Sequence, residues 1–212
     1  MTTIDHIKKY INGIEPQEAI FSDDIYNYVK KKVPDIDRAT FNTNMQRYEK
    51  TDDLFIRYQK GVYYKTVKTP FGKANINMLS VIKRMYVTDG KEIFGYETGP
   101  SYMNKIGLTT QLPKLTYIAT DKARYSTTDK EKGVVFKKPV IEINKNNYRY
   151  LQLLDALENK EGVAIEAEDH IGILKNQIEK YRLDFEMLLG YARYYNNIKV
   201  YNGLAMLVRG VR

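Results

Sequence analysis

The first residues in this sequence whose types and spacing suggest a chemistry are four polar side chains: Thr40, Thr43, Asn44 and Arg47. At helical spacing these positions lie together on one side of a helix. The four side chains offer hydrogen-bond donors and acceptors, and none of them is a carboxylate. In the major groove of DNA, arginine pairs with guanine and asparagine pairs with adenine. The pattern therefore indicates a helix face that reads base pairs.

Three basic side chains follow, and their positions suggest contacts with phosphates: Arg57, Lys60 and Lys65. Apolar residues alternate with others over residues 54–58 and again over residues 62–66, which is typical of two strands. Gly61 can supply the positive φ that a three-residue turn at residues 59–61 requires. This β-hairpin would hold Lys60 at its tip, where contacts with phosphates fix the register on DNA without reading its sequence.

Two capped helices must position the face that reads bases. Ser22 can cap a first helix, because its hydroxyl can accept hydrogen bonds from the free amides of the first turn, and Pro34 ends that segment. Asp37 can cap a second helix over residues 38–50, which carries the polar face. An earlier helix over residues 4–14, with isoleucines at helical spacing, completes a three-helix core. Together with the hairpin, these helices predict a winged helix-turn-helix that binds double-stranded DNA.

The charge of the same region leaves an alternative open. Residues 1–68 contain 12 Lys and Arg against 10 Asp and Glu, a net charge of only +2. Two amphipathic helices and a hairpin also occur in modules that dock other proteins. A second hypothesis is therefore an interaction adaptor, or a transcriptional regulator that responds to a ligand. The first hypothesis predicts binding that weakens steeply with salt, because contacts with DNA phosphates release counterions.

Composition limits the remaining classes of function. The 212 residues are 43% hydrophobic and include no cysteine, so we expect a globular protein without disulfides or thiolate metal sites. We find no signal segment and no apolar run that could span a membrane, and we expect a cytoplasmic protein. Neither His6 nor His170 has a neighbouring His or Cys at ligand spacing, and Asp52 with Asp53 fits a turn better than a catalytic pair. We predict no enzyme activity, no metal and no cofactor.

The periodicity breaks at residues 68–72, and we place a domain boundary between residues 69 and 70. Residues 70–212 predict a mixed α/β domain that ends in helices, so the fold class of the chain is α+β. Strands are expected at residues 93–96, 115–119, 134–136 and 140–143, and helices at residues 73–87, 101–106, 148–157, 171–181 and 185–192. Glu166, Glu168 and Asp169 are expected at the start of a helix, and Asn202 with Gly203 should break the chain before a last apolar segment.

Most of the net charge of +8 lies in the middle of the chain. Residues 69–150 carry 14 basic and 7 acidic side chains, whereas residues 151–212 carry 8 and 9. Such an excess can form an electrostatic surface for RNA, for DNA or for an acidic protein, or it can be a solvated lysine-rich face. The candidate surface contains eight basic residues: Lys83, Arg84, Lys122, Arg124, Lys130, Lys132, Lys137 and Lys138.

Two motifs connect these expectations to a known family. Gly-Val-Tyr-Tyr at residues 61–64 ends the hairpin, and Gly-Leu-Thr-Thr-Gln-Leu-Pro lies at residues 107–113. Together they resemble the AbiEi family of antitoxins, which belong to bacterial abortive-infection systems of phage defence. The resemblance spans most of the chain, from the predicted winged helix to the helical end.

This resemblance implies a protein with two roles. The N-terminal winged helix would repress its own operon by binding operator DNA, with inverted half-sites expected for a two-fold arrangement. The domain at residues 70–212 would counteract a toxin that resembles a nucleotidyltransferase. In the type IV toxin-antitoxin systems of this family, the antitoxin forms no stable complex with the toxin. The four polar side chains of the second helix would then read DNA, and the eight basic residues would form the antitoxicity patch.

Overall fold

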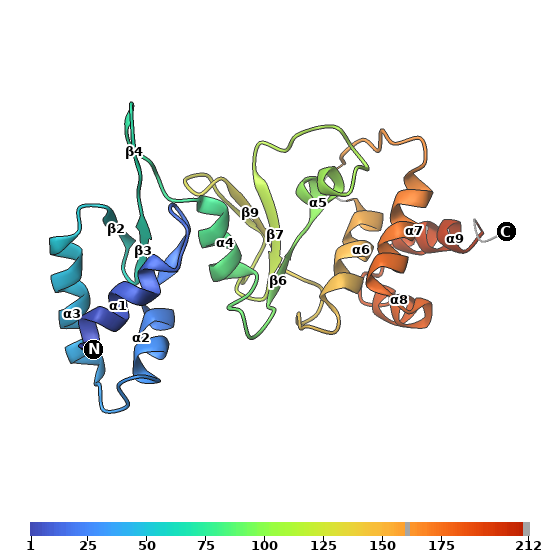
Figure 1. Cartoon of the computed structure of the whole chain (residues 1–212). Coiled ribbons are helices and arrows are strands. Elements are labelled where there is room, and N and C mark those ends of the chain that lie inside the picture. Colours follow the sequence, from blue (N-terminus) through green and yellow to red (C-terminus); the bar gives the residue numbers. More distant parts are fainter. Residues whose placement is uncertain (160–161, 210–212) are drawn as a thin grey trace. The chain divides into compact units, whose positions relative to one another are not determined.

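The computed structural model describes residues 1–159 and 162–209 and has a mixed α+β fold (Figure 1). The chain forms two compact units, Met1–Ile82 and Lys83–Arg212. Each unit contains a hydrophobic core of its own. In the two described stretches, no helix combines the length and the apolar character that a membrane crossing requires.

Three helices form most of the first unit: α1 (Thr3–Asn12), α2 (Ser22–Lys30) and α3 (Arg38–Thr51). Asp37 caps α3 as predicted, because its carboxylate accepts the backbone N–H of Thr40 at 2.8 Å. The predicted cap at Ser22 is wrong. Phe21 occupies the cap position of α2 without a side-chain hydrogen bond, and the backbone N–H of Ser22 donates to the carbonyl of Gly61.

Apolar side chains of the three helices meet in one core. Ile7 and Ile11 on α1, Ile25 on α2 and Phe41 on α3 are completely buried. Burying one such side chain contributes about 1.5–3 kcal/mol relative to leaving it exposed. The apolar residues that recur at helical spacing in the sequence are therefore the residues that form this core.

A small antiparallel sheet completes the first unit. Its strands are β1 (Ile20–Phe21), β2 (Phe55–Gln59) and β3 (Val62–Lys65), in the order β1-β3-β2. The predicted hairpin is confirmed, but its turn consists of two residues, Lys60 and Gly61, rather than three. Gly61 has the expected positive φ of 78°. A bulge between Arg57 and Gln59 takes up the resulting shift in register.

The chain stays with the first unit for longer than the sequence suggests. A second hairpin contains β4 (Lys68–Thr69) and β5 (Gly72–Lys73), and α4 spans Met78–Tyr86. The backbone N–H of Asn77 donates to the carbonyl of Gln17 at 2.7 Å, and the backbone N–H of Ala19 donates to the hydroxyl of Ser80 at 3.0 Å. Because these hydrogen bonds return the chain to the loop after α1, the two units divide after residue 82 instead of residue 69.

The second unit contains a four-stranded sheet. Its strands are β6 (Gly95–Glu97), β7 (Thr116–Thr120), β8 (Thr127–Asp129) and β9 (Val134–Lys137), and α5 (Gly99–Lys105) follows β6. The order is β6-β7-β9-β8, with β7 and β9 parallel and the other pairs antiparallel. The predicted strand at residues 140–143 is wrong, because the backbone N–H of Ile143 donates to the carboxylate of Asp121 rather than to a strand. The polar strand β8 has no predicted counterpart.

Four helices end the second unit: α6 (Tyr148–Glu158), α7 (His170–Tyr181), α8 (Phe185–Ala192) and α9 (Ile198–Arg209). The predicted break at Asn202 and Gly203 is wrong, because both residues lie inside α9. A Cβ on Gly203 would lie 2.7 Å from Cδ2 of Leu157 on α6. The glycine therefore permits a close approach of α9 to α6, and packing outweighs its poor helix propensity.

A buried ion pair joins β9 to α6. The ammonium of Lys137 lies 3.0 Å from the carboxylate of Asp155 and 3.1 Å from that of Glu158. The hydroxyls of Thr98 and Tyr195 also donate to Asp155. Burial alone would lower the pKa of Lys137, but the two carboxylates outweigh it and raise that pKa above its usual value. Lys137 therefore belongs to the core of the second unit and not to the predicted surface patch.

One carboxylate holds the loop that carries the Gly-Leu-Thr-Thr-Gln-Leu-Pro motif. Glu166 accepts the hydroxyl and the backbone N–H of Thr110 at 2.5 and 2.8 Å, and the side-chain amide of Gln111 at 3.1 Å. These hydrogen bonds, that of the Thr110 hydroxyl foremost, lower the pKa of Glu166 to about 2. Asp169 begins a helix as predicted, because it accepts the backbone N–H of Gly172 as the cap of α7. Glu166 instead acts as a clamp on this loop.

We predict that Lys137→Met lowers the free energy of unfolding by about 3–5 kcal/mol, because it leaves two buried carboxylates without their cation. Urea denaturation of the full chain, followed by circular dichroism, measures this loss. Lys138→Met is the matched control, because Lys138 is the exposed neighbour on the same segment. The control should change the free energy by no more than about 0.5 kcal/mol. Equal losses in the two variants would contradict the role assigned to the ion pair.

A second prediction concerns the loop held by Glu166. Its pKa of about 2 lies below the usual 4.5, so the carboxylate stabilises the loop above pH 4.5 and loses this effect as the pH falls toward 2. Hydrogen exchange at the Thr110 amide, which donates to Glu166, reports the effect. After correction for intrinsic exchange, we expect protection at Thr110 to fall across this range in the native protein. In Glu166→Gln it should be low and constant, and a remaining pH dependence there would exclude Glu166 as the cause.

Candidate nucleic-acid interface

A groove in the first unit lies between α3 and the hairpin of β2 and β3. Its volume is about 460 Å³. Helix α3 contributes Arg38, Asn42 and Gln46, and the hairpin contributes Arg57 and Lys60. Three cationic side chains and two amides therefore line one concave surface. Cationic side chains bind phosphates and amides bind the edges of bases, so these groups suit a nucleic acid.

Helix α3 and the hairpin of β2 and β3 place these side chains. Arg38, Asn42 and Gln46 are spaced four residues apart, so they form a row along one side of α3. In the hairpin, Arg57 pairs in register with Tyr63 on β3. The ring of Tyr63 packs into the core below the groove, which fixes the hairpin against α3.

Arg38 is held firmly at one edge of the groove. Its guanidinium forms an ion pair with Asp23 and lies 4.7 Å from the ring centroid of Tyr26 and 5.4 Å from that of Phe41. The arginine side chain remains 42% exposed, so the ion pair itself contributes little to stability. Asp23 also brings a negative charge into the groove, which opposes the binding of a phosphate at this end.

Among the described residues, the four predicted base readers do not line this groove. Three of them form hydrogen bonds to groups of α3 itself or to its cap residue. The hydroxyl of Thr40 donates to the cap residue Asp37, the hydroxyl of Thr43 donates to the carbonyl of Ala39, and the amide of Asn44 donates to the carbonyl of Thr40. Asn44 is half-buried, whereas Thr40, Thr43 and Arg47 are exposed. Arg47 is thus the predicted reader with the most freedom to reach a base.

Asn42 and Gln46 are the candidate readers that the sequence pattern missed. Both are exposed and line the groove. Their spacing of four residues after Arg38 was a visible signal. A helix carries several polar rows, however, and the sequence does not say which row lies beside the hairpin.

Two of the three predicted phosphate contacts lie in the groove. Arg57 and Lys60 are exposed, and Lys60 forms part of the turn between β2 and β3. Lys65 is half-buried and pairs with Phe55 at the opposite end of β3 from that turn. The groove therefore gathers its positive charge near the turn of the hairpin.

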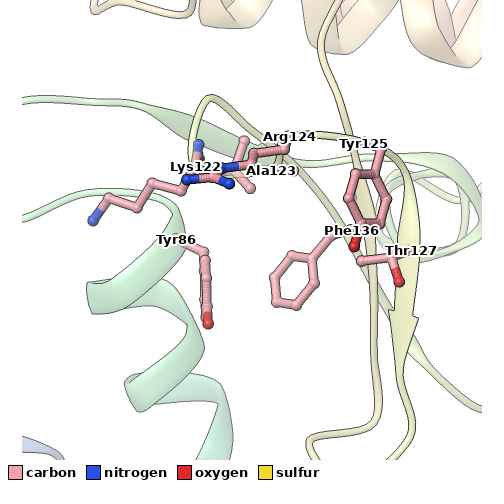
Figure 2. Close-up of a pocket in the computed structure, with 8 residues that line it drawn as sticks. Tyr86, Lys122, Ala123, Arg124, Tyr125, Thr127 and Phe136 are labelled. Atoms are coloured by element: carbon pink, nitrogen blue, oxygen red, sulfur yellow. Dashed lines mark hydrogen bonds between the residues drawn. The ribbon is translucent and has the colours of Figure 1, made fainter.

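The eight residues of the predicted basic patch have different environments. Five of them are exposed: Lys83, Lys122, Arg124, Lys130 and Lys138. Arg84 is half-buried, Lys132 forms an ion pair with Asp129, and Lys137 is enclosed in the core. Lys122 and Arg124 line the same pocket, which has a volume of about 280 Å³ (Figure 2). The second unit therefore offers a local site with two cations rather than a uniform lysine surface.

Within residues 1–159 and 162–209, no group of three or more His, Cys, Asp or Glu side chains could hold a metal ion. Comparison of the chain with protein-family models and with curated proteins gives no match. Any functional interpretation therefore depends on the geometry of the groove and the pocket, together with the resemblance of the two sequence motifs.

Proposed function

We propose that the first unit is a winged helix-turn-helix that binds operator DNA and represses the operon encoding the protein. The observation that carries this proposal is the groove between α3 and the hairpin. Its cations, Arg38, Arg57 and Lys60, suit phosphates, and its amides, Asn42 and Gln46, suit base edges. One surface thus offers both the positioning and the reading contacts that a repressor needs.

The order of the elements supports this proposal. Helices α2 and α3 follow each other directly, as do the two helices of a helix-turn-helix, in which the second helix enters the major groove. Helix α1 shares their core through Ile7 and Ile11. The hairpin of β2 and β3 borders the groove beside α3, which is the position of a wing, with Lys60 in its turn.

The buried side of α3 determines which residues would face DNA. A helix turns by about 100° per residue. Opposite the buried row of Phe41 and Met45, this rotation brings Thr43, Gln46 and Arg47 to the exposed side. We therefore propose Gln46 and Arg47 as the main readers, with Asn42 and Thr43 beside them and with Arg57 and Lys60 on phosphates.

We further propose that the second unit provides an antitoxin activity against a toxin resembling a nucleotidyltransferase. The support is the resemblance to the AbiEi family, in which no stable complex between antitoxin and toxin is expected. In the Gly-Leu-Thr-Thr-Gln-Leu-Pro motif, Gly107 has a positive φ of 84°, Leu108 is buried and Thr110 is clamped by Glu166. These residues build the scaffold, so the exposed basic residues remain the candidates for the activity itself.

One observation favours a second function, a protein-docking adaptor. The carboxylate of Asp23 lies in the groove and is paired with Arg38. A mixed surface of this kind also suits a peptide with charges of both signs. The two functions are separated by a gel-shift titration of the purified chain against the DNA upstream of its own gene, at two salt concentrations, beside a scrambled duplex. Binding that prefers the natural sequence and weakens with salt supports the repressor, and binding to neither duplex supports the adaptor.

Within the repressor, reading and positioning residues should respond differently to substitution. We predict that Gln46→Ala and Arg47→Ala each weaken operator binding by about 1–3 kcal/mol, because each removes contacts with base edges, and leave binding to the scrambled duplex nearly unchanged. Lys60→Ala should weaken binding to both duplexes and reduce the salt slope by about 1, because it removes one phosphate contact. Lys9→Ala, on an exposed α1 residue outside the groove, is the control. An equal loss on both duplexes for Arg47→Ala would exclude it as a reader.

Repression and antitoxin activity should be separable in the full chain. We predict that the double variant Gln46→Ala, Lys60→Ala loses repression of an operon reporter, because both residues lie in the groove. It should still protect cells that express a nucleotidyltransferase-like toxin. Growth and reporter activity are measured in the same strain, with protein amounts matched by immunoblot. Loss of protection together with repression would contradict the proposed division of roles between the two units.

A further inference from the structure

The pocket in the second unit is lined mainly by aromatic and cationic side chains. Tyr86 at the end of α4, Phe136 on β9 and Tyr125 in the loop before β8 supply the aromatic surface. The ring centroids of Tyr86 and Phe136 are 4.4 Å apart, and the two rings are inclined by 48°. Figure 2 shows these two rings facing the same space, with Tyr125 and Thr127 along one side. Because Tyr125 is 70% exposed, its ring is available to a ligand.

The two cations of the pocket have different roles. The ammonium of Lys122 donates to the carbonyl of Met85 at 2.6 Å and lies 3.8 Å from the ring centroid of Phe94. Figure 2 shows this side chain extending away from the rings of the pocket. Arg124 is exposed and has neither a hydrogen bond nor an ion pair with the described part of the chain. Its guanidinium therefore keeps its full capacity to bind an anion at the pocket.

The chemistry of this lining selects a class of ligand. The described residues that line the pocket include two cations, two tyrosines and no carboxylate. An aromatic ring stacks on a planar heterocycle of any kind, and a guanidinium binds a phosphate through two parallel hydrogen bonds. The volume of about 280 Å³ lies just below the usual range of small-molecule sites, which excludes a large cofactor. A ligand with one heterocycle and one phosphate suits the aromatic surface, the guanidinium and the volume of the pocket.

We propose that this pocket binds a single nucleotide unit, with the base on Tyr125 and its phosphate on Arg124. The hydroxyls of Tyr86 and Thr127 then supply donors and acceptors for the edge of the base or for the sugar. The unit belongs either to a free mononucleotide or to an unpaired stretch of RNA, since both present the same chemistry. Duplex DNA does not fit, because its bases are stacked and paired. This site is therefore separate in chemistry from the groove of the first unit.

Calorimetric titration of the full chain with AMP, adenosine, inorganic phosphate and a short single-stranded RNA tests the proposal. AMP should bind more tightly than adenosine or phosphate, because it alone among these three uses both the ring and the guanidinium. Tyr125→Ala should weaken AMP binding by about 5- to 150-fold, the range for loss of one stacked base, while Tyr125→Phe should retain it. Arg124→Gln should weaken AMP binding and leave adenosine binding unchanged. A single-stranded RNA that binds more tightly than AMP identifies the unit as part of a strand.

Two control variants make the result specific. Tyr194→Ala removes another exposed tyrosine of the second unit and should leave all affinities unchanged. Lys60→Ala weakens the proposed operator contact and should leave AMP binding unchanged, so failure of the operator proposal and failure of this one give different results. The proposal is overturned if no probe binds, if phosphate binds as tightly as AMP, if Tyr125→Ala and Tyr194→Ala behave alike, or if Lys60→Ala abolishes binding.

Discussion

The ion pair of Lys137 with Asp155 and Glu158 is the interaction on which the second unit depends. Removing charges from water is costly, and such a group is stable only when its carboxylates and its ammonium have partners. The hydroxyls of Thr98 and Tyr195 complete the shell of Asp155. The ammonium and the two hydroxyls all contact Asp155 on α6. They come from β9, from the residue after β6 and from the segment after α8. The network therefore favours a single register of α6 against the sheet.

The same strand carries this network on one face and the pocket on the other. Successive side chains of a strand point to opposite faces of its sheet. Because Lys137 is directed toward α6, its neighbour Phe136 is directed toward Tyr86 and the pocket. The position of the Phe136 ring in the pocket thus depends on the buried ion pair of Lys137, which does not line the pocket. A rigid element positioned by its core gives the pocket a defined shape before any ligand binds.

The sequence was most informative where local signals and packing agree. The cap at Asp37 and the apolar spacing of α3 predicted that helix because both depend on nearby residues. The predictions that were wrong concern residues whose structure is set by contacts with distant parts of the chain. Gly203 was predicted to break the chain, yet its missing side chain allows α9 to approach Leu157. β8 was missed because it is a polar edge strand without apolar alternation. The side chains of Gln46 and Thr40 lie on different rows of α3, and the position of the hairpin decides which row lines the groove.

The small net charge of the first unit weighs less against DNA binding than its value of +2 suggests. Several of its carboxylates are occupied by local backbone contacts: Asp5 in the capping box of α1, Asp37 at the start of α3 and Asp52 in the turn before β2. A carboxylate at a helix start is offset by the free amides beside it. Asp23 is the acidic residue that lines the groove, and it neutralises Arg38 at one end. Because the backbone N–H of Ser22 donates to the carbonyl of Gly61 and the guanidinium of Arg38 donates to the hydroxyl of Ser22, this ion pair lies beside the turn of the hairpin. In the proposed complex with DNA, Arg57 and Lys60 are therefore the cations of the groove that bind phosphates.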